Sequence, residues 1–93
     1  MPSVTELSQE EHLTFELIRA IRADAETSCA PDKVELVSVT IDVSADLNGQ
    51  TDVRFVPLID RKTRTILFTK GTAYAGDAAI MTATAVYRIM PAG

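Results

Sequence analysis

The second half of the chain alternates apolar and polar residues with the two-residue period of β-strands. From Val34 onward the pattern is that of a strand with one buried face. Its apolar positions are Val37, Val39, Ile41 and Val43, and its polar positions are Ser38, Thr40, Asp42 and Ser44. Turn-forming residues follow from 45 to 50. We therefore predict a first strand between Val34 and this turn.

Three further strands are predicted after the turn. The second run passes through Val53, Phe55 and Ile59, and it contains Pro57, which has no amide hydrogen to donate. This strand is therefore expected at an edge of the sheet or bulged. The charged segment 60–64 is predicted to reverse the chain into a third strand over 65–74. A fourth strand follows the turn at 75–77, and such short turns predict antiparallel pairing throughout.

The length of the turn before the last strand decides which side chains of the third and fourth strands share a face, because a slip of one residue in the pairing exchanges the two faces. We expect a three-residue loop with Gly76 in the left-handed region. This register gathers small residues on one face and places Lys70 beside threonines on the other, whereas a two-residue loop would put Lys70 against Ala83. The small residues are Gly71, Ala73, Ala79, Ala83 and Ala85. Such a strip allows a helix backbone to approach closely.

One helix is predicted, from Ser8 to about Thr27. Ser8 and Glu11 have the spacing of a capping box, and Pro31 follows the predicted end. Apolar residues recur every four positions, at Leu13, Leu17, Ile21 and Ala25. The expected fold class is therefore α+β, with one long N-terminal helix packed against a curled antiparallel four-stranded sheet, and residues 1–93 form a single domain.

Composition and length constrain the partners. A chain of 93 residues has a modest core, and one helix cannot cover all the apolar residues of this sheet. The residues expected to remain uncovered are Val37, Val39, Phe55, Val56, Leu58 and Ile66. We therefore expect a homodimer or a dimer of dimers. The net charge of −4, without a basic stripe, argues against a nucleic-acid partner.

The chain shows no pattern of a membrane span or of a signal peptide, so a cytoplasmic protein without a membrane partner is expected. Cys29 is the single cysteine, which excludes an internal disulfide and a cysteine metal site within one chain. No histidine follows it, so a structural thiol is expected rather than a nucleophile. We expect no metal and no resident cofactor.

The order of these elements resembles the hotdog fold of acyl-CoA thioesterases, the phenylacetic-acid-pathway type in particular. The resemblance covers roughly residues 9 to 90. The matching segments are 39–43 (VTIDV), 49–53 (GQTDV), 61–68 (RKTRTILF), 76–77 (GD) and 81–89 (MTATAVYRI). It implies a hotdog-like fold and an acyl-CoA thioester as the substrate, in a cleft between subunits.

The chain also departs from that family. Its members usually have a first strand ahead of the helix, often with a His-Gly-Gly turn at the helix start and an acid about two turns into the helix. Here only seven residues precede Ser8, no glycine occurs before Gly49, and Arg19, Ala20 and Ile21 stand two turns beyond His12. The chain thus resembles a hotdog protein shortened at the N-terminus that keeps the helix end but not the usual carboxylate.

Three helix residues are candidates to replace the missing acid. His12 and Glu16 are four residues apart near the positive end of the helix dipole, so Glu16 could act as base and His12 could orient it. Asp24 lies beside the apolar stripe and could face a dimer cleft. Most such residues are solvated surface partners, and this alternative stays open for all three.

Basic and turn residues supply the remaining candidates. Arg61, Lys62 and Arg64 would suit the phosphates of coenzyme A, although a charged hairpin tip usually only keeps sheets apart. Asp46 and Asn48 could meet the helix end of a neighbouring subunit, and turn formation is the alternative. For Tyr74 and Tyr87 we expect packing, with the hydroxyl at the rim.

Two functions remain open at this point. The first is a thioesterase-like enzyme that hydrolyses an acyl-CoA thioester at a subunit interface. The second is a non-catalytic hotdog module that binds an acyl or aromatic ligand or acts as a structural subunit. An α+β sandwich of unrelated function is a further alternative for the fold.

Overall fold

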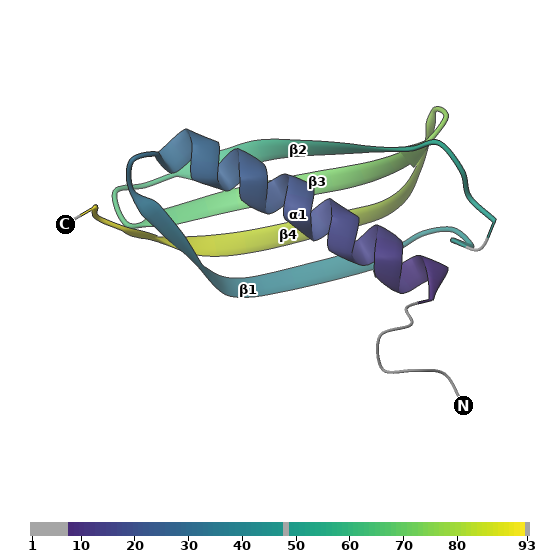
Figure 1. Cartoon of the computed structure of the whole chain (residues 1–93), viewed down its shortest axis with the longest axis horizontal. Helices are drawn as coiled ribbons and strands as arrows, with labels where there is room; N and C mark the ends of the chain where they lie inside the picture. The colour runs from purple at the N-terminus through teal and green to yellow at the C-terminus, as the bar shows by residue number, and fades with distance from the viewer. Residues whose placement is uncertain (1–7, 48, 93) are drawn as a thin grey trace.

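The computed structural model describes residues 8–47 and 49–92, which form one helix and four strands (Figure 1). The elements are α1 (Gln9–Cys29), β1 (Lys33–Val43), β2 (Val53–Lys62), β3 (Ile66–Ala75) and β4 (Ala78–Met90). The sheet has the order β1-β4-β3-β2, and every pair is antiparallel. It curves around α1 without closing. The predicted α+β, hotdog-like fold class is confirmed.

The helix begins where the capping box predicts. Ser8 is the N-cap, and its side chain accepts a hydrogen bond from the amide of Glu11. The helix ends at Cys29, two residues later than expected, and the amide of Ala30 bonds to the carbonyl of Glu26. Only Ala30 separates the helix end from Pro31. The helix cannot continue there, because proline has no amide hydrogen to donate to the next helical hydrogen bond.

Small residues of β3 and β4 lie directly under α1, as predicted. Ala73, Ala83 and Ala85 are fully buried. The closest approach is at Gly71, where an added Cβ would lie 2.6 Å from two carbon atoms of the Ile21 side chain. The absence of a side chain at this position therefore sets the distance between the helix and the sheet.

The hairpin between β3 and β4 pairs Lys70 and Gly71 as expected, but its turn length differs from the prediction. Its turn has two residues rather than three, because Ala75 pairs with Ala78. The register then shifts between Ala73 and Tyr74, which leaves Ile80 without a partner on β3. This bulge restores the pairing of Lys70 with Thr84 and of Gly71 with Ala83. Both Ile80 and Met81 are buried there, and the prediction that Ala79 belongs to the buried strip was wrong.

Strand β2 lies at an edge of the sheet, as Pro57 indicated. The reversal predicted over 60–64 begins later than expected, since β2 continues through a register shift between Ile59 and Arg61 and ends at Lys62. The reversal occurs at 63–65 instead. There the Thr63 hydroxyl accepts a hydrogen bond of 2.9 Å from the amide of Ile66, so a threonine side chain closes a turn that the charges alone did not reveal.

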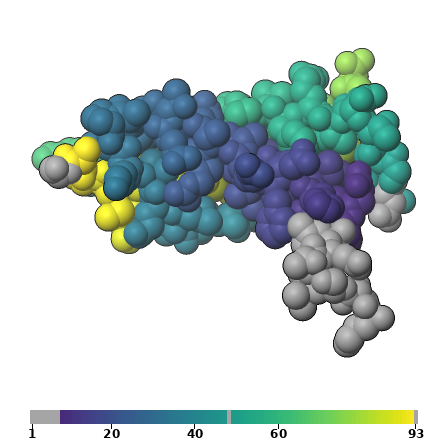
Figure 2. All heavy atoms as spheres, viewed as in Figure 1, coloured from purple at the N-terminus to yellow at the C-terminus, as the bar shows by residue number. Residues whose placement is uncertain are grey.

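Strand β1 forms the other edge and is only partly covered. A register shift between Leu36 and Ser38 places Leu36 and Val39 on the same face as the buried residues of β4. Val39 nevertheless stays 37% exposed and Val43 52% exposed, because α1 packs mainly against β2 and β3. In the space-filling view, β1 and β2 both remain visible on either side of the helix (Figure 2).

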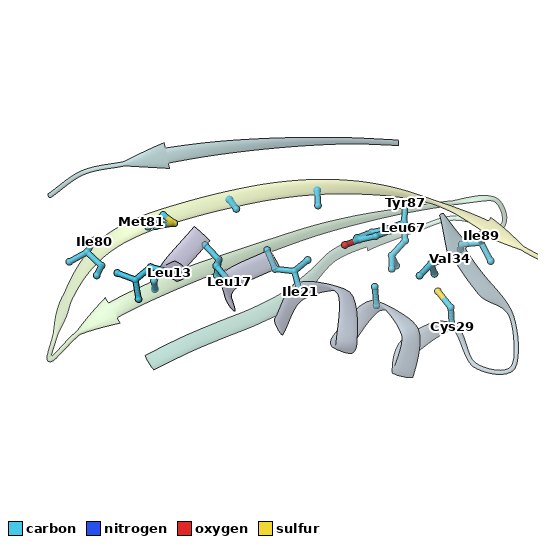
Figure 3. Close-up of a cluster of buried hydrophobic side chains, with 14 of the residues drawn as sticks. Leu13, Leu17, Ile21, Cys29, Val34, Leu67, Ile80, Met81, Tyr87 and Ile89 are labelled. Carbon is cyan, nitrogen blue, oxygen red and sulfur yellow. The ribbon is translucent and has the colours of Figure 1, made fainter. Parts of the chain in front are cut away.

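The core is a single cluster between α1 and one face of the sheet (Figure 3). The helix contributes Leu13, Leu17, Ile21, Ala25 and Cys29, and the sheet contributes Val34, Leu67, Ala73, Ile80, Met81, Ala83, Ala85, Tyr87 and Ile89. Leu47, from the connection between β1 and β2, completes it. Within the described part of the chain, no helix is both long and apolar enough to cross a membrane.

The close approach of α1 predicts the effect of Gly71→Ala. The new methyl group would overlap Ile21, which is itself 1% exposed, so the helix or the side chain must move. We expect a loss of about 1–3 kcal/mol in the free energy of unfolding, measured by urea denaturation. The loss should be smaller in an Ile21→Val background, which removes the terminal methyl group. An equal loss in both backgrounds would mean that this contact does not set the helix position.

Candidate functional site

The start of α1 is closed by its own side chains. The Ser8 hydroxyl accepts from the Glu11 amide at 3.2 Å, and Glu11 Oε1 accepts from the Ser8 amide at 3.1 Å. Hydrogen bonds from the Ser8 amide and then the Ser8 side chain lower the pKa of Glu11, and the neighbouring His12 charge acts in the same direction. The first turn therefore already holds a stabilised carboxylate.

Two backbone donors of this helix start have no hydrogen-bond partner among residues 8–47 and 49–92. The amides of Gln9 and Glu10 have no carbonyl partner inside the helix, as in the first turn of any α-helix. The Gln9 side chain donates to the Gln50 carbonyl at 3.1 Å, so the connection between β1 and β2 lies against the helix start. A substrate carbonyl could accept from the two amides, next to the carboxylates of the first turn.

The three predicted helix residues lie in one row along α1. His12, Glu16 and Asp24 share this row with Ala20, since side chains four residues apart lie one above another on a helix. His12 and Glu16 are exposed, and Asp24 is half-buried. Within residues 8–47 and 49–92, Glu16 and Asp24 make no hydrogen bond or ion pair. Their carboxylates are therefore accessible to a ligand or to a second chain.

This row faces the β2 side of the molecule. The opposite flank of α1 is turned toward β1 and β4, because Thr14 Oγ1 lies 3.8 Å from Met81 Sδ and Arg22 Nη2 donates to the Val34 carbonyl at 3.4 Å. The row of Glu16 and Asp24 must then lie on the other flank. We call it the β2 flank of α1.

The basic residues divide between the two faces of β2. Lys62 lies on the helix side, where its Nζ donates to the Ser28 carbonyl at 3.0 Å in the last turn of α1. Arg61 pairs with Phe68 on the open face of the sheet, and Arg64 lies exposed in the following turn. Lys62 thus shares the β2 flank with the predicted acids, although His12 and Ser28 are roughly 24 Å apart along the helix axis.

The remaining candidates have structural surroundings. Cys29 is 3% exposed and lies in the core with Val34 and Ile89, as a structural thiol would (Figure 3). Asp46 is exposed in the connection after β1, and Asn48 lies outside the described residues. Across the described residues, no group of three His, Cys, Asp or Glu side chains could hold a metal ion.

Tyr87 departs from its sequence-based prediction. Its side chain is 1% exposed, and its hydroxyl is buried without a hydrogen-bond partner among the described residues, instead of reaching the rim. Burial raises the pKa of this hydroxyl. Alternation placed Tyr87 correctly on a strand but could not show that the helix covers the whole ring. Tyr74 instead lies on the open face, with the Arg54 guanidinium 4.9 Å from its ring centre.

Comparison of the structure with solved structures identifies this architecture. The BH2602 protein from Bacillus halodurans, whose crystal structure contains CoA, matches with a TM-score of 0.78 at 12% identity. YhdA from Lactococcus lactis, a candidate thioesterase, matches with a TM-score of 0.72 at 14% identity. The chain has a hotdog-like fold. A phenylacetic acid degradation-related protein from Ralstonia eutropha, also a candidate thioesterase, matches with a TM-score of 0.71 at 14% identity.

The hotdog-like match covers nearly all of this chain but not all of the other proteins. It includes 97%, 91% and 95% of this chain, and 60%, 65% and 66% of the three chains respectively. No family model matches the sequence, and no curated protein matches it. At these identities the similarity establishes the fold that the sequence resemblance implied.

The capping box predicts a pH-dependent stability. The pKa of Glu11 is below its ordinary value of 4.5 in the folded state, so its ionised form stabilises the fold above that pH. This stabilisation disappears as the pH falls through the lowered pKa. In urea denaturation, Glu11→Gln should be less stable than the wild type at pH 7, and the difference should vanish at acidic pH. Glu10→Gln is the control, since Glu10 accepts no hydrogen bond from the cap. A difference independent of pH would contradict the assignment.

The unpaired hydroxyl of Tyr87 predicts a stabilising substitution. A buried hydroxyl without a partner opposes folding, and Tyr87→Phe removes it while keeping the ring. We expect the free energy of unfolding to rise by about 1 kcal/mol. Tyr74→Phe, on the open face, should change it by less than about 0.5 kcal/mol. If thermal denaturation shows Tyr87→Phe to be less stable than the wild type, the hydroxyl has a partner in solution.

Proposed function

We propose that this hotdog-like protein acts on an acyl-CoA thioester in a site completed by a second copy of the chain. The supporting observation is the shared fold. Two of the similar structures belong to candidate thioesterases, and a third contains CoA. The resemblance in sequence pattern over residues 9 to 90 supports the same substrate class.

The β2 flank of α1 is the proposed position of the reacting group. The amides of Gln9 and Glu10, at the positive end of the helix dipole, would polarise the thioester carbonyl. Glu16 is the proposed base because it is exposed and follows Gln9 by about two turns. Its carboxylate would accept a proton from the attacking water. The water oxygen bonds to the acyl carbon, and the coenzyme A sulfur leaves and is protonated, giving a carboxylic acid and a free thiol.

Asp24 and His12 complete the proposal. Asp24 lies two turns beyond Glu16 in the same row and is half-buried, so it is the alternative base if the acyl group sits deeper along the flank. His12, one turn before Glu16, would orient the substrate or the carboxylate. The common row allows one bound ligand to meet all three residues in succession.

The basic residues at the end of β2 are the proposed phosphate contacts of coenzyme A. Lys62 is already on the β2 flank, and Arg61 and Arg64 adjoin it in the chain. Because Lys62 lies at the far end of α1 from Gln9, these residues would serve a thioester bound at the helix start of the neighbouring copy. This geometry favours a site shared between two chains.

The helix start also favours a second candidate function. Ser8 and Glu11 satisfy each other, and the two carboxylates of the first turn oppose the negative charge that develops on a thioester oxygen. No hydrogen bond within the described residues orients Glu16. A non-catalytic module that binds an acyl or aromatic ligand, or serves as a structural subunit, would need neither feature.

Hydrolysis of a panel of aryl, short-chain and long-chain acyl-CoA thioesters, followed with a thiol reagent, tests the proposal. We expect turnover, with a loss of about 10²–10⁴-fold in Glu16→Gln or Asp24→Asn, as for removal of a general base. Glu26→Gln is the control, since this exposed acid pairs with Arg22 at 3.8 Å on the opposite flank. Binding of the thioesters without turnover would select the second candidate. Turnover unchanged in both variants would exclude these residues as the base.

A further inference from the structure

The hydroxyl of Tyr87 is the one buried side-chain polar atom of the described residues without a hydrogen-bond partner. Such a group opposes folding, since it has lost its bonds to water and gained none in the protein. The ring lies between the sheet and α1, where Leu36 of β1 and Leu67 of β3 are its strand partners (Figure 3). A phenylalanine ring would fill the same space without this cost. Packing alone therefore does not account for the hydroxyl.

Two charged side chains of α1 lie close to this hydroxyl. Burial raises the pKa of Tyr87, and of the two nearby charges Arg22 lowers that pKa while Glu26 raises it. The hydroxyl therefore keeps its proton at neutral pH and can donate a hydrogen bond. Arg22 Nη2 also reaches the Val34 carbonyl, so this side of the helix adjoins β1. We call it the β1 flank of α1, and it includes Ile18 one turn before Arg22.

The guanidinium of Arg22 is only loosely held. Its hydrogen bond to the Val34 carbonyl measures 3.4 Å and its ion pair with Glu26 measures 3.8 Å, whereas a strong charge-assisted bond is about 2.8 Å long. The Arg22 side chain is 47% exposed. An exposed ion pair of this kind adds little to stability. Arg22 can therefore turn toward a better acceptor at small cost and admit it to the hydroxyl.

The surface beside these two groups is apolar and uncovered. Leu36, the β1 partner of Tyr87, is 41% exposed, and Val39 on the same face of the strand is 37% exposed. On the helix, Ile18 is half-buried. A ligand at this position would meet a cation and a hydroxyl donor at one end and aliphatic side chains next to them. This combination suits a small organic acid, whose carboxylate accepts both hydrogen bonds.

We propose that Tyr87 and Arg22 bind the carboxylate of a small apolar acid between α1 and β1. One carboxylate oxygen accepts from the Tyr87 hydroxyl, and the Arg22 guanidinium leaves its long ion pair to donate to the same carboxylate. The apolar part of the acid lies on Ile18, Leu36 and Val39 and removes their surface from water. Binding thus supplies the partner that the hydroxyl lacks in the free protein. This site is separate from the β2 flank of α1, and its occupation does not depend on hydrolysis.

Isothermal titration calorimetry with 3-phenylpropanoate and hexanoate tests the site. Both acids should bind, and their neutral amides should bind at least about tenfold more weakly, because an amide lacks the charge that Arg22 pairs with. Tyr87→Phe should weaken binding of the acids by about tenfold or more, as for loss of a hydrogen bond to a charged group. Arg22→Gln should have a similar effect. Tyr74→Phe and Arg19→Gln are the matched controls and should change the affinity by less than about twofold.

Nuclear magnetic resonance locates the bound acid without a substitution. Addition of 3-phenylpropanoate to the wild type should shift the ring resonances of Tyr87 and the Nε resonance of Arg22, and should leave the ring of Tyr74 unchanged. Circular dichroism confirms that each variant is folded.

Three results would overturn the proposed acid site. They are a wild type that binds neither acid, equal binding of the acids and their amides, and binding of the acids that Tyr87→Phe does not weaken. The last result is also expected if a water molecule is the partner of the hydroxyl. No thioester enters these measurements, so failure of the proposed function is detected separately.

Discussion

The structure depends on the close approach of one helix to a strip of small residues. Ala73, Ala83 and Ala85 are buried, and at Gly71 the Leu17 and Ile21 side chains approach the sheet closely, which holds α1 against it. The position of the helix has two effects. It covers the centre of the sheet, and it leaves both the β1 edge and the β2 flank of α1 accessible. The surface proposed for chemistry, the β2 flank of α1, thus lies beside this contact and outside the core.

The candidate catalytic residues lie outside the hydrophobic core. Among the residues that the structure describes, the core contains the Cys29 thiol, the Tyr87 phenol and Thr69, whose hydroxyl donates to the Ala85 carbonyl. The acids stay on the surface of α1, where water or a second chain decides their surroundings. The chain thus has a hotdog-like fold, as the candidate thioesterases do, with its predicted acids outside the core.

Much of the fold could be predicted because it rests on periodicity. Alternation indicated the four strands, the four-residue recurrence of apolar positions indicated the helix, and glycine and alanine marked the contact between them. The turns were less predictable. Thr63 closes the β2–β3 turn through a side-chain hydrogen bond, and charge patterning cannot reveal such a bond. For the site, residue spacing placed His12 and Glu16 on one face of the helix and Asp24 beside its apolar stripe. It could not show which flank they occupy, because that depends on how α1 crosses the sheet.

The extra residue at Ile80 links two features of the β3–β4 hairpin that are usually considered separately. A two-residue turn shifts the pairing by one position, and the bulge shifts it back. Turn length and bulge must therefore change together in any sequence that keeps this architecture. A relative with one more residue at the turn can dispense with the bulge, and a gap placed near Gly76 in an alignment should be offset by an opposite gap near Ile80. Alignments that allow this compensation can detect distant kinship that a rigid comparison of the two strands would miss.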